Sequence, residues 1–137
     1  MQDKTYRLEI QSDPAVLPQV EEFIEKAVED SNIEKSALNN LMMAVNEATT
    51  NGMLHGNKAD INKKVQITLA INNKRIKVII KDQGNGFDPS KVPDPTTPEN
   101  IYKESGRGLF IMQTCMDEVD YKFTPDGTEL SLLLKLE

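Results

Sequence analysis

The stretch "AVNEATTNGMLHGN", residues 44–57, places polar side chains directly behind an apolar run that is typical of a buried helix. On an α-helix, Glu47 and Asn51 lie one turn apart on one face, and His55 continues the same row. Small neighbours leave room for a group to approach this face: Ala44, Ala48 and Gly52. Taken alone, the stretch is equally compatible with an ordinary solvated helix face, so its interpretation depends on the rest of the chain.

Hydrophobic periodicity predicts a strand and two helices around this stretch. Residues 5–11 alternate apolar and polar side chains, the period of a strand with one buried face. Residues 19–32 carry apolar side chains at three- and four-residue spacings, which predicts an amphipathic helix. The same spacing continues over 34–57, so we expect a second, longer helix that ends near Gly56.

Further strands and one further helix are predicted downstream. Residues 64–72 and 75–82 form two strand-like runs, joined at a turn where Asn73 could adopt the left-handed conformation. Residues 89–104 are rich in Pro, Asp and Thr, which predicts a loop. A helix over 105–119 and a hairpin over 121–137, turning at "PDG", complete the chain.

The order of these elements predicts the fold class. Strand, helix, helix, strand, strand, loop, helix, strand, strand fits an α+β two-layer sandwich, with helices on one face of a mixed, mostly antiparallel sheet. We expect a single domain over residues 1–137, because this length supplies one hydrophobic core.

Composition excludes several classes of function. Sixteen basic against 22 acidic residues give a formal charge of −6, which opposes direct binding of nucleic acid. The one cysteine, Cys115, excludes an intrachain disulfide and a zinc site built from cysteines. The sequence has no basic-then-apolar leader and no apolar run near twenty residues, so we expect no membrane segment and a cytoplasmic protein.

A second polar motif, "DQGNGFD", follows the apolar strand that ends at residue 82. Asp82 can accept a hydrogen bond from an amino group, and Gly84 and Gly86 allow the backbone to approach a flat or charged ligand. A simple turn is the alternative interpretation. The motif is not the dinucleotide fingerprint G-x-G-x-x-G, because Pro89 occupies the third glycine position, and the sequence contains no phosphate-binding P-loop.

A third motif, "SGRG", stands between the predicted loop and the last helix. Backbone N–H groups at the start of a helix attract phosphate, and Gly106 and Gly108 would let a phosphate approach them. Arg107 adds a fixed positive charge. A glycine hinge with a surface arginine remains the alternative.

Together, the three motifs resemble those of the GHKL superfamily of ATP-binding domains. The N box would be Glu47 and Asn51, the first glycine box Asp82, Gly84 and Gly86, and the second Gly106 and Gly108. Within that superfamily, "MMAVNEATTN", "DQGNGFDP" and "GRGLFIMQTCMDEV" are most similar to the anti-sigma factor serine/threonine kinases of the RsbW type. The resemblance covers nearly the whole chain and implies the GHKL type of two-layer sandwich.

The resemblance implies roles for the residues of the first two motifs. Asp82 would accept the adenine amino group, and Gly84 and Gly86 would admit the base. Asn51 would bind Mg²⁺ through its amide oxygen. Glu47 would act as general base towards the acceptor hydroxyl.

For the third motif, the resemblance implies that Gly106 and Gly108 hold phosphates and that residues 88–105 form an ATP lid. Some relatives carry a basic residue just before the Ser-Gly of this box, whereas this chain has Glu104 there. Whether Lys103 or Arg107 reaches the γ-phosphate is left open by the sequence, and we favour Arg107.

The function implied is that of an ATP- and Mg²⁺-dependent serine/threonine protein kinase acting as an anti-sigma factor. It would phosphorylate a STAS-domain anti-anti-sigma partner, sequester a sigma factor, and form a homodimer through the edge of its N-terminal strand. A nucleotide-dependent binding module that transfers no phosphate is the main alternative. A histidine-kinase catalytic domain is weaker, because the single histidine, His55, lies within the N box.

Overall fold

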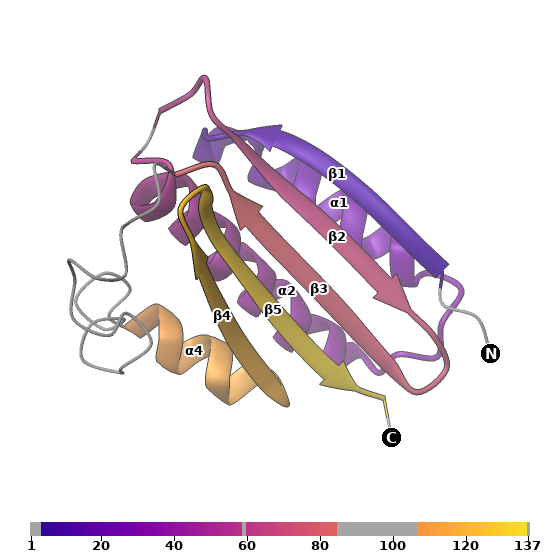
Figure 1. The fold of residues 1–137 in the computed structure, drawn as a ribbon. Helices are drawn as coiled ribbons and strands as arrows, with labels where there is room; N and C mark the ends of the chain where they lie inside the picture. The colour runs from indigo at the N-terminus through magenta and orange to yellow at the C-terminus, as the bar shows by residue number, and fades with distance from the viewer. Residues whose placement is uncertain (1–3, 59, 85–106, 137) are drawn as a thin grey trace.

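The structure is a computed structural model that describes residues 4–58, 60–84 and 107–136. One layer is a five-stranded sheet, and helices form the second layer against one of its faces (Figure 1). The strands are β1 (Lys4–Gln11), β2 (Lys64–Ile71), β3 (Arg75–Asp82), β4 (Glu118–Thr124) and β5 (Gly127–Lys135). Their order is β1-β2-β3-β5-β4, and each of these neighbouring pairs is antiparallel.

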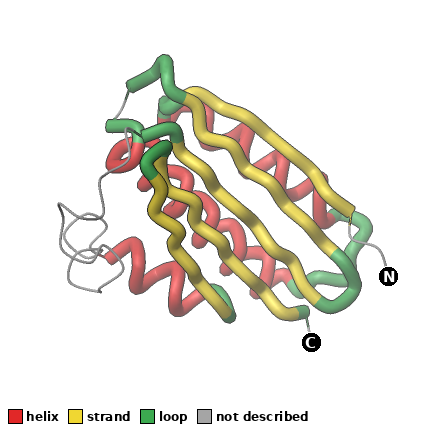
Figure 2. Tube along the Cα trace, in the orientation of Figure 1, coloured by secondary structure: helices red, strands yellow, loops and turns green. Residues whose placement is uncertain are grey.

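The helical layer contains three α-helices and two shorter segments among the described residues (Figure 2). They are η1 (Pro14–Val16), α1 (Leu17–Val28), α2 (Lys35–Asn51), η2 (Gly52–Gly56) and α4 (Arg107–Cys115). The first turn starts at Asp13, whose side chain caps it by accepting a hydrogen bond of 3.0 Å from the Ala15 N–H. No described helix is both long enough and apolar enough to cross a membrane.

The core lies between the sheet and the helices. Along β3, Ile76, Val78 and Ile80 are buried while Lys77 and Lys81 are exposed, which is the alternation that the sequence predicts. The helices contribute buried side chains from one stripe each: Val20, Ile24, Ala27 and Val28 from α1, and Leu41, Ala44, Val45 and Ala48 from α2. The predicted α+β two-layer sandwich is therefore confirmed.

The turn between β2 and β3 differs from the prediction. Among the described residues, Lys58 is the one non-glycine residue with a positive φ, so Asn73 does not adopt the left-handed conformation. Asn72 closes the turn instead, because its Oδ1 accepts hydrogen bonds from the N–H groups of Lys74 (2.8 Å) and Arg75 (3.0 Å). An asparagine side chain that mimics a backbone turn removes the need for the left-handed residue.

The small residues of α2 also lie elsewhere than predicted. Ala44 and Ala48 are 0% and 2% exposed and belong to the core, so they open no space for a ligand. Their small side chains let α2 pack closely on the sheet. Gly52, one turn further, is in ordinary contact with the sheet: a Cβ there would lie 3.6 Å from the Cβ of Asp82.

Two further predictions concern the ends of the fold. β1 is an edge strand, as the proposed homodimer contact requires, but the dimer itself remains a prediction. The predicted lid, residues 88–105, lies outside the described residues.

The hairpin between β4 and β5 confirms the predicted turn at "PDG". Thr124 Oγ1 donates a hydrogen bond of 2.9 Å to the Gly127 carbonyl oxygen, and the Asp126 N–H donates to Thr124 Oγ1 at 3.3 Å. Gly127 has a φ of +144°. Its Cα lies so close to the end of β3 that an added Cβ would overlap the main-chain oxygen of Asp82.

We expect Gly127→Ala to lower the free energy of unfolding by about 1–3 kcal/mol, because both the positive φ and the overlap oppose a side chain. Gly52→Ala is the matched control: its φ is −60° and its Cβ would meet only ordinary contacts. The control should stay within about 1 kcal/mol of the parent. Equal unfolding midpoints in urea for both variants would contradict the close approach at Gly127.

Candidate functional site

Asp82 is a carboxylate placed at the end of a core strand. It is the last residue of β3 and continues the buried series of Val78 and Ile80, so its side chain points to the helical layer. Only 5% of the residue is exposed. An acid at such a position needs hydrogen-bond donors, because burial of an unpaired carboxylate is strongly unfavourable.

Backbone groups from two segments supply these donors. Asp82 Oδ1 accepts hydrogen bonds of 3.0 Å from the N–H groups of both Gly84 and Thr128. Gly56 borders the carboxylate from a third segment, since an added Cβ there would overlap the carboxylate oxygens. Both backbone donors in the described residues reach Oδ1, whereas Oδ2 is the carboxylate oxygen nearer to Gly56.

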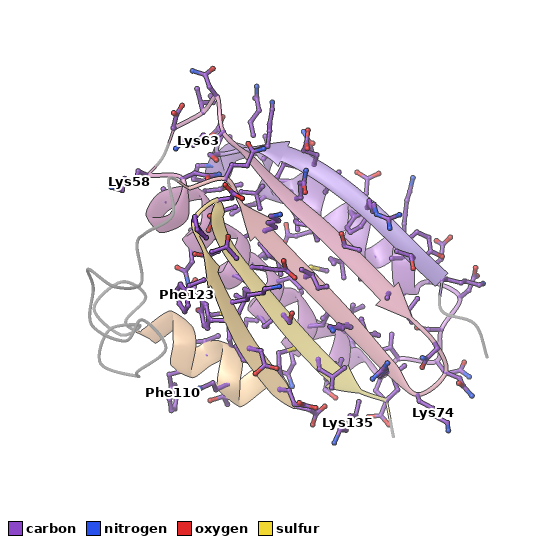
Figure 3. The ribbon with its side chains drawn as sticks, in the orientation of Figure 1. Lys58, Lys63, Lys74, Phe110, Phe123 and Lys135 are labelled. Atoms are coloured by element: carbon purple, nitrogen blue, oxygen red, sulfur yellow. The ribbon has the colours of Figure 1, made fainter. Side chains whose placement is uncertain are left out.

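The electrostatics of Asp82 reflect these surroundings. Burial is the largest effect and raises the pKa of the Asp82 carboxyl above its ordinary value of 3.8. The hydrogen bonds from Thr128 and Gly84 act in the opposite direction, and so does the charge of Lys63. Lys63 lies at the end of the sheet next to η2, on the same side as Lys58 (Figure 3).

The end of α2 changes its helical geometry before it reaches Asp82. Residues 52–56 form a π-helix, which closes with a hydrogen bond of 2.8 Å from the Asn57 N–H to the Gly52 oxygen. This wider turn carries Gly56 to the carboxylate. Because the helical period changes after Asn51, the predicted row of Glu47, Asn51 and His55 does not continue as a regular α-helical face, and the His55 side chain lies outside the described parts.

The two N-box residues are half-buried on the last turns of α2. Glu47 precedes Asn51 by four residues, so the carboxylate and the amide share one face, as predicted. The Nδ2 atom of Asn51 is buried and has no hydrogen-bond partner among the described residues. Asn51 shares this status with Asn46 Oδ1 and Thr49 Oγ1, and its N–H group can donate to an oxygen of a bound group.

The remaining predicted site residues are placed only in part. Gly86 and Gly106 lie outside the described residues. Arg107 and Gly108 open α4, as predicted for the second glycine box, but the position of the Arg107 side chain is not described. Lys103 also lies outside, so the choice between Lys103 and Arg107 stays open.

A comparison with protein families identifies the architecture. Residues 10–134 match the model of the histidine kinase-like ATPase domain. The chain belongs to this family. The match includes α2, β2, β3 and β4, so the buried Asp82 and the half-buried N box lie within a histidine kinase-like ATPase domain.

Individual relatives of this ATPase domain are serine-protein kinases named RsbW. The chain is 40% identical over 88 residues to RsbW of Bacillus subtilis (strain 168), covering 60% of this chain and 55% of the relative. It is 36% identical over 97 residues to RsbW of Staphylococcus aureus (strain JH9), covering 66% and 60% of the two chains. The chain thus spans little more than half the length of the curated relatives it matches.

Solved structures share the ATPase fold. A crystal structure of the RsbU and RsbW domains of a Mycobacterium tuberculosis protein superposes with a TM-score of 0.72 at 13% identity, over 97% of this chain and 32% of that chain. A blue-light activated histidine kinase of Erythrobacter litoralis gives 0.61 at 16% identity, over 90% and 41%. At these identities the likeness establishes the fold alone.

Sequence reasoning missed three contributors to the site of this ATPase domain. Gly127 and Thr128 were interpreted only as part of a turn, and Gly56 only as the end of a helix. The signal for the first two was present as a glycine-threonine pair at the start of a strand, but only the pairing of β5 with β3 brings it to Asp82.

The residues present fit a nucleotide with a metal ion. The unpartnered Nδ2 of Asn51 can donate to a phosphate oxygen, and the amide oxygen of the same side chain can bind a metal ion. Amide oxygens are suitable ligands for Mg²⁺. A carboxylate beside backbone N–H groups suits a flat base that carries an amino donor.

The raised pKa of Asp82 predicts a pH-dependent difference in stability between the parent and Asp82→Asn. Because the folded state holds this proton more tightly than the unfolded state, the contribution of Asp82 to stability is fully present below 3.8 and is lost as the pH rises through the raised pKa. Asp82→Asn does not titrate, so its free energy of unfolding should rise relative to that of the parent across this window and stay parallel above it.

Urea unfolding of both proteins from about pH 4 to about pH 8 measures this difference, and the other carboxylates cancel in the comparison. Asp120→Asn, at an exposed position of β4, is the control for the loss of one negative charge. If the difference in free energy of unfolding between the parent and Asp82→Asn does not change with pH, the carboxylate is not buried.

Proposed function

We propose that this chain binds Mg-ATP and acts as a serine/threonine protein kinase of the anti-sigma factor type. Its substrate is a hydroxyl side chain of a STAS-domain anti-anti-sigma protein, and it sequesters a sigma factor when that partner is unavailable. The observation that supports nucleotide binding is the buried Asp82 carboxylate. One of its oxygens accepts two backbone hydrogen bonds, and the glycines at 56 and 127 lie in close contact with the residue.

Adenine recognition follows from the geometry of Asp82. Its Oδ2 accepts a hydrogen bond from the 6-amino group of adenine, while the bonds from Gly84 and Thr128 hold Oδ1 in place. By the resemblance of the motif, Gly84 and Gly86 would admit the base. Guanine presents a carbonyl at the corresponding position, so two acceptors would face each other and GTP should bind poorly.

The N box performs the chemistry of transfer. When bound, Mg-ATP supplies the γ-phosphoryl group and a metal ion that neutralises charge on the phosphates. Asn51 holds the metal ion through its amide oxygen. Its Nδ2, which has no partner among the described residues, is a donor from which a phosphate oxygen can accept a hydrogen bond. Glu47, one turn earlier on α2, accepts the proton of the acceptor hydroxyl.

Phosphate binding is assigned to the start of α4. The N–H groups around Gly106 and Gly108 bind phosphate oxygens, helped by the dipole of α4, and Arg107 contacts the γ-phosphate. The residues 88–105 close over the nucleotide as a lid. These roles rest on the order and spacing of the motifs in the sequence.

The choice of protein substrate rests on the relatives. Several relatives carry the name serine-protein kinase RsbW, and the chain matches 55% to 60% of their length at 36% to 40% identity. The half-buried Glu47 beside Asn51 supports phosphoryl transfer, because a carboxylate at this place has a role as proton acceptor that binding alone does not require.

Asp82→Asn should weaken ATP binding by about 1.5–3 kcal/mol, the contribution of a hydrogen bond to a charged group. The fold should persist, because the amide oxygen can still accept the bonds from Gly84 and Thr128. Isothermal calorimetry with ATP measures the loss, and Asp120→Asn provides the same change of charge at an exposed position. Unchanged affinity in folded Asp82→Asn would remove Asp82 from adenine recognition.

Glu47→Ala should bind Mg-ATP within a few fold of the parent while transferring phosphate about 10²–10⁴ times more slowly, the usual contribution of a general base. Asn51→Ala should lose both binding and transfer, because the metal ion joins the protein to the phosphates. Single-turnover transfer of labelled phosphate to candidate STAS proteins, run beside an ATP titration, separates the two effects.

Transfer by Glu47→Ala at the parent rate would make Glu47 a structural carboxylate. If the parent phosphorylates none of the STAS proteins encoded in its genome, yet binds a partner only with nucleotide, a nucleotide-dependent binding module replaces the kinase. Both outcomes would leave the adenine site at Asp82 in place, since that site is tested by binding alone.

A further inference from the structure

Asn57 is a buried amide that connects three separate segments next to the site. It follows η2 and is 1% exposed. Its Nδ2 donates to Ser12 Oγ at 2.8 Å and to the Lys64 carbonyl oxygen at 3.0 Å, and its Oδ1 accepts from the Gln83 N–H at 2.7 Å. Every polar atom of this side chain is therefore hydrogen-bonded.

The partners of Asn57 extend the network to the ends of the strands. Ser12, which directly follows β1 and is 4% exposed, donates from Oγ to the Lys63 carbonyl oxygen at 2.8 Å. Gln83 Oε1 accepts a hydrogen bond of 2.6 Å from the Lys64 N–H. The chain leaving β1, the start of β2 and the chain leaving β3 are thus held together around one amide.

This network surrounds Asp82 on two sides. On one side, Asn57 holds the N–H of Gln83, the residue between Asp82 and Gly84, and Gly84 is a backbone donor to the carboxylate. On the other side, Asn57 is adjacent to Gly56, whose Cα borders the carboxylate oxygens. Movement of the Asn57 side chain would therefore shift both the Gly84 N–H and Gly56, two of the groups that fix the orientation of the Asp82 carboxylate.

All polar atoms of the Asn57 side chain are hydrogen-bonded within this network, so Asn57 would affect a ligand by changing the position of Asp82. Fully bonded buried amides fix the geometry around them, because each lost bond leaves an unpaired group in the interior. A purely structural amide would do the same for the fold without changing which base the site prefers. The two possibilities differ in nucleotide selectivity.

We propose that Asn57, supported by Ser12, is a positioning residue that sets base selectivity by orienting Asp82. The inference rests on the proposed adenine site and adds a residue that the N box and the glycine boxes do not include. It assigns the discrimination between a 6-amino and a 6-carbonyl purine to a network that begins at β1, outside the motifs.

The experiment compares the dissociation constants of ATP and ITP, whose base carries a carbonyl in place of the adenine amino group. The dissociation constant of ITP divided by that of ATP measures the preference for adenine, and it reports the contact between Asp82 and the base. In Asn57→Ala, this ratio should fall by about tenfold, part of the discrimination that a hydrogen bond to a charged group supplies. In an Asp82→Asn background, adding Asn57→Ala should cause no further loss of discrimination.

Asn72→Ala is the matched control. It also removes an asparagine side chain with two hydrogen bonds to backbone groups, but at the β2-β3 turn, the end of β3 opposite Asp82. This variant should lose thermal stability and keep the parent ratio of ATP to ITP affinity. A lower unfolding temperature alone, shared by both variants, therefore does not support the proposal.

Ser12→Ala provides a milder variant in case Asn57→Ala does not fold. It removes one of the three partners of Asn57 and should lower the ratio by about two- to threefold. Parent ratios in folded Asn57→Ala, or in Ser12→Ala where Asn57→Ala does not fold, would overturn the proposal while leaving the adenine site intact. A parent protein that binds ATP and ITP equally would instead overturn the adenine site, and this inference with it.

Discussion

The constraint on which the site depends is the burial of one carboxylate at the end of a core strand. A carboxylate that is 5% exposed is unfavourable unless donors reach it, and the available donors are main-chain N–H groups from Gly84 and Thr128. The main chain can approach the carboxylate this closely only where a residue has no side chain, which explains the glycines at both positions, Gly56 and Gly127. The positions of η2 and of the last hairpin follow from that requirement.

The strand order makes this convergence possible. Because β5 lies between β3 and β4, the start of β5 is adjacent to the end of β3, and the hairpin places its N–H groups beside Asp82. On the helical side, Ala44 and Ala48 let α2 pack closely on the sheet, and the π-helical turn then carries the chain to the carboxylate. Both layers thus meet at one strand end.

Local sequence patterns predicted most of this architecture. Alternation identified the first strand, strand-like runs the next two, and the turn at "PDG" the last hairpin, while three- and four-residue spacing identified the first two helices. All of these signals depend on neighbours along the chain. Asp82, Glu47 and Asn51 were selected as candidate site residues from local residue types and spacing, and their roles stay predictions. Thr128 was missed because its contact with Asp82 depends on the order of the strands. The π-helical turn was missed because the contact between Gly56 and Asp82 joins residues that are distant in the sequence.

The errors have the same origin. Asn73 was expected in the left-handed conformation because turns often require it, but the side chain of Asn72 performs the closure instead. Small residues on α2 were interpreted as space for a ligand, although in a helix that lies on a sheet they equally shorten the distance between layers. Local patterns specify which residues are small, whereas only the assembled layers determine what lies opposite them.

Asp82 and Thr128 are 46 positions apart in the sequence, so the two halves of the site are synthesised at different times. During synthesis on the ribosome, β1, α1, α2, β2 and β3 are complete before the second backbone donor of the carboxylate exists. Long-range contacts of this kind form late in folding, since the closure of the intervening chain opposes them. The nascent chain therefore carries Asp82 without its Thr128 donor until the last hairpin has left the ribosome.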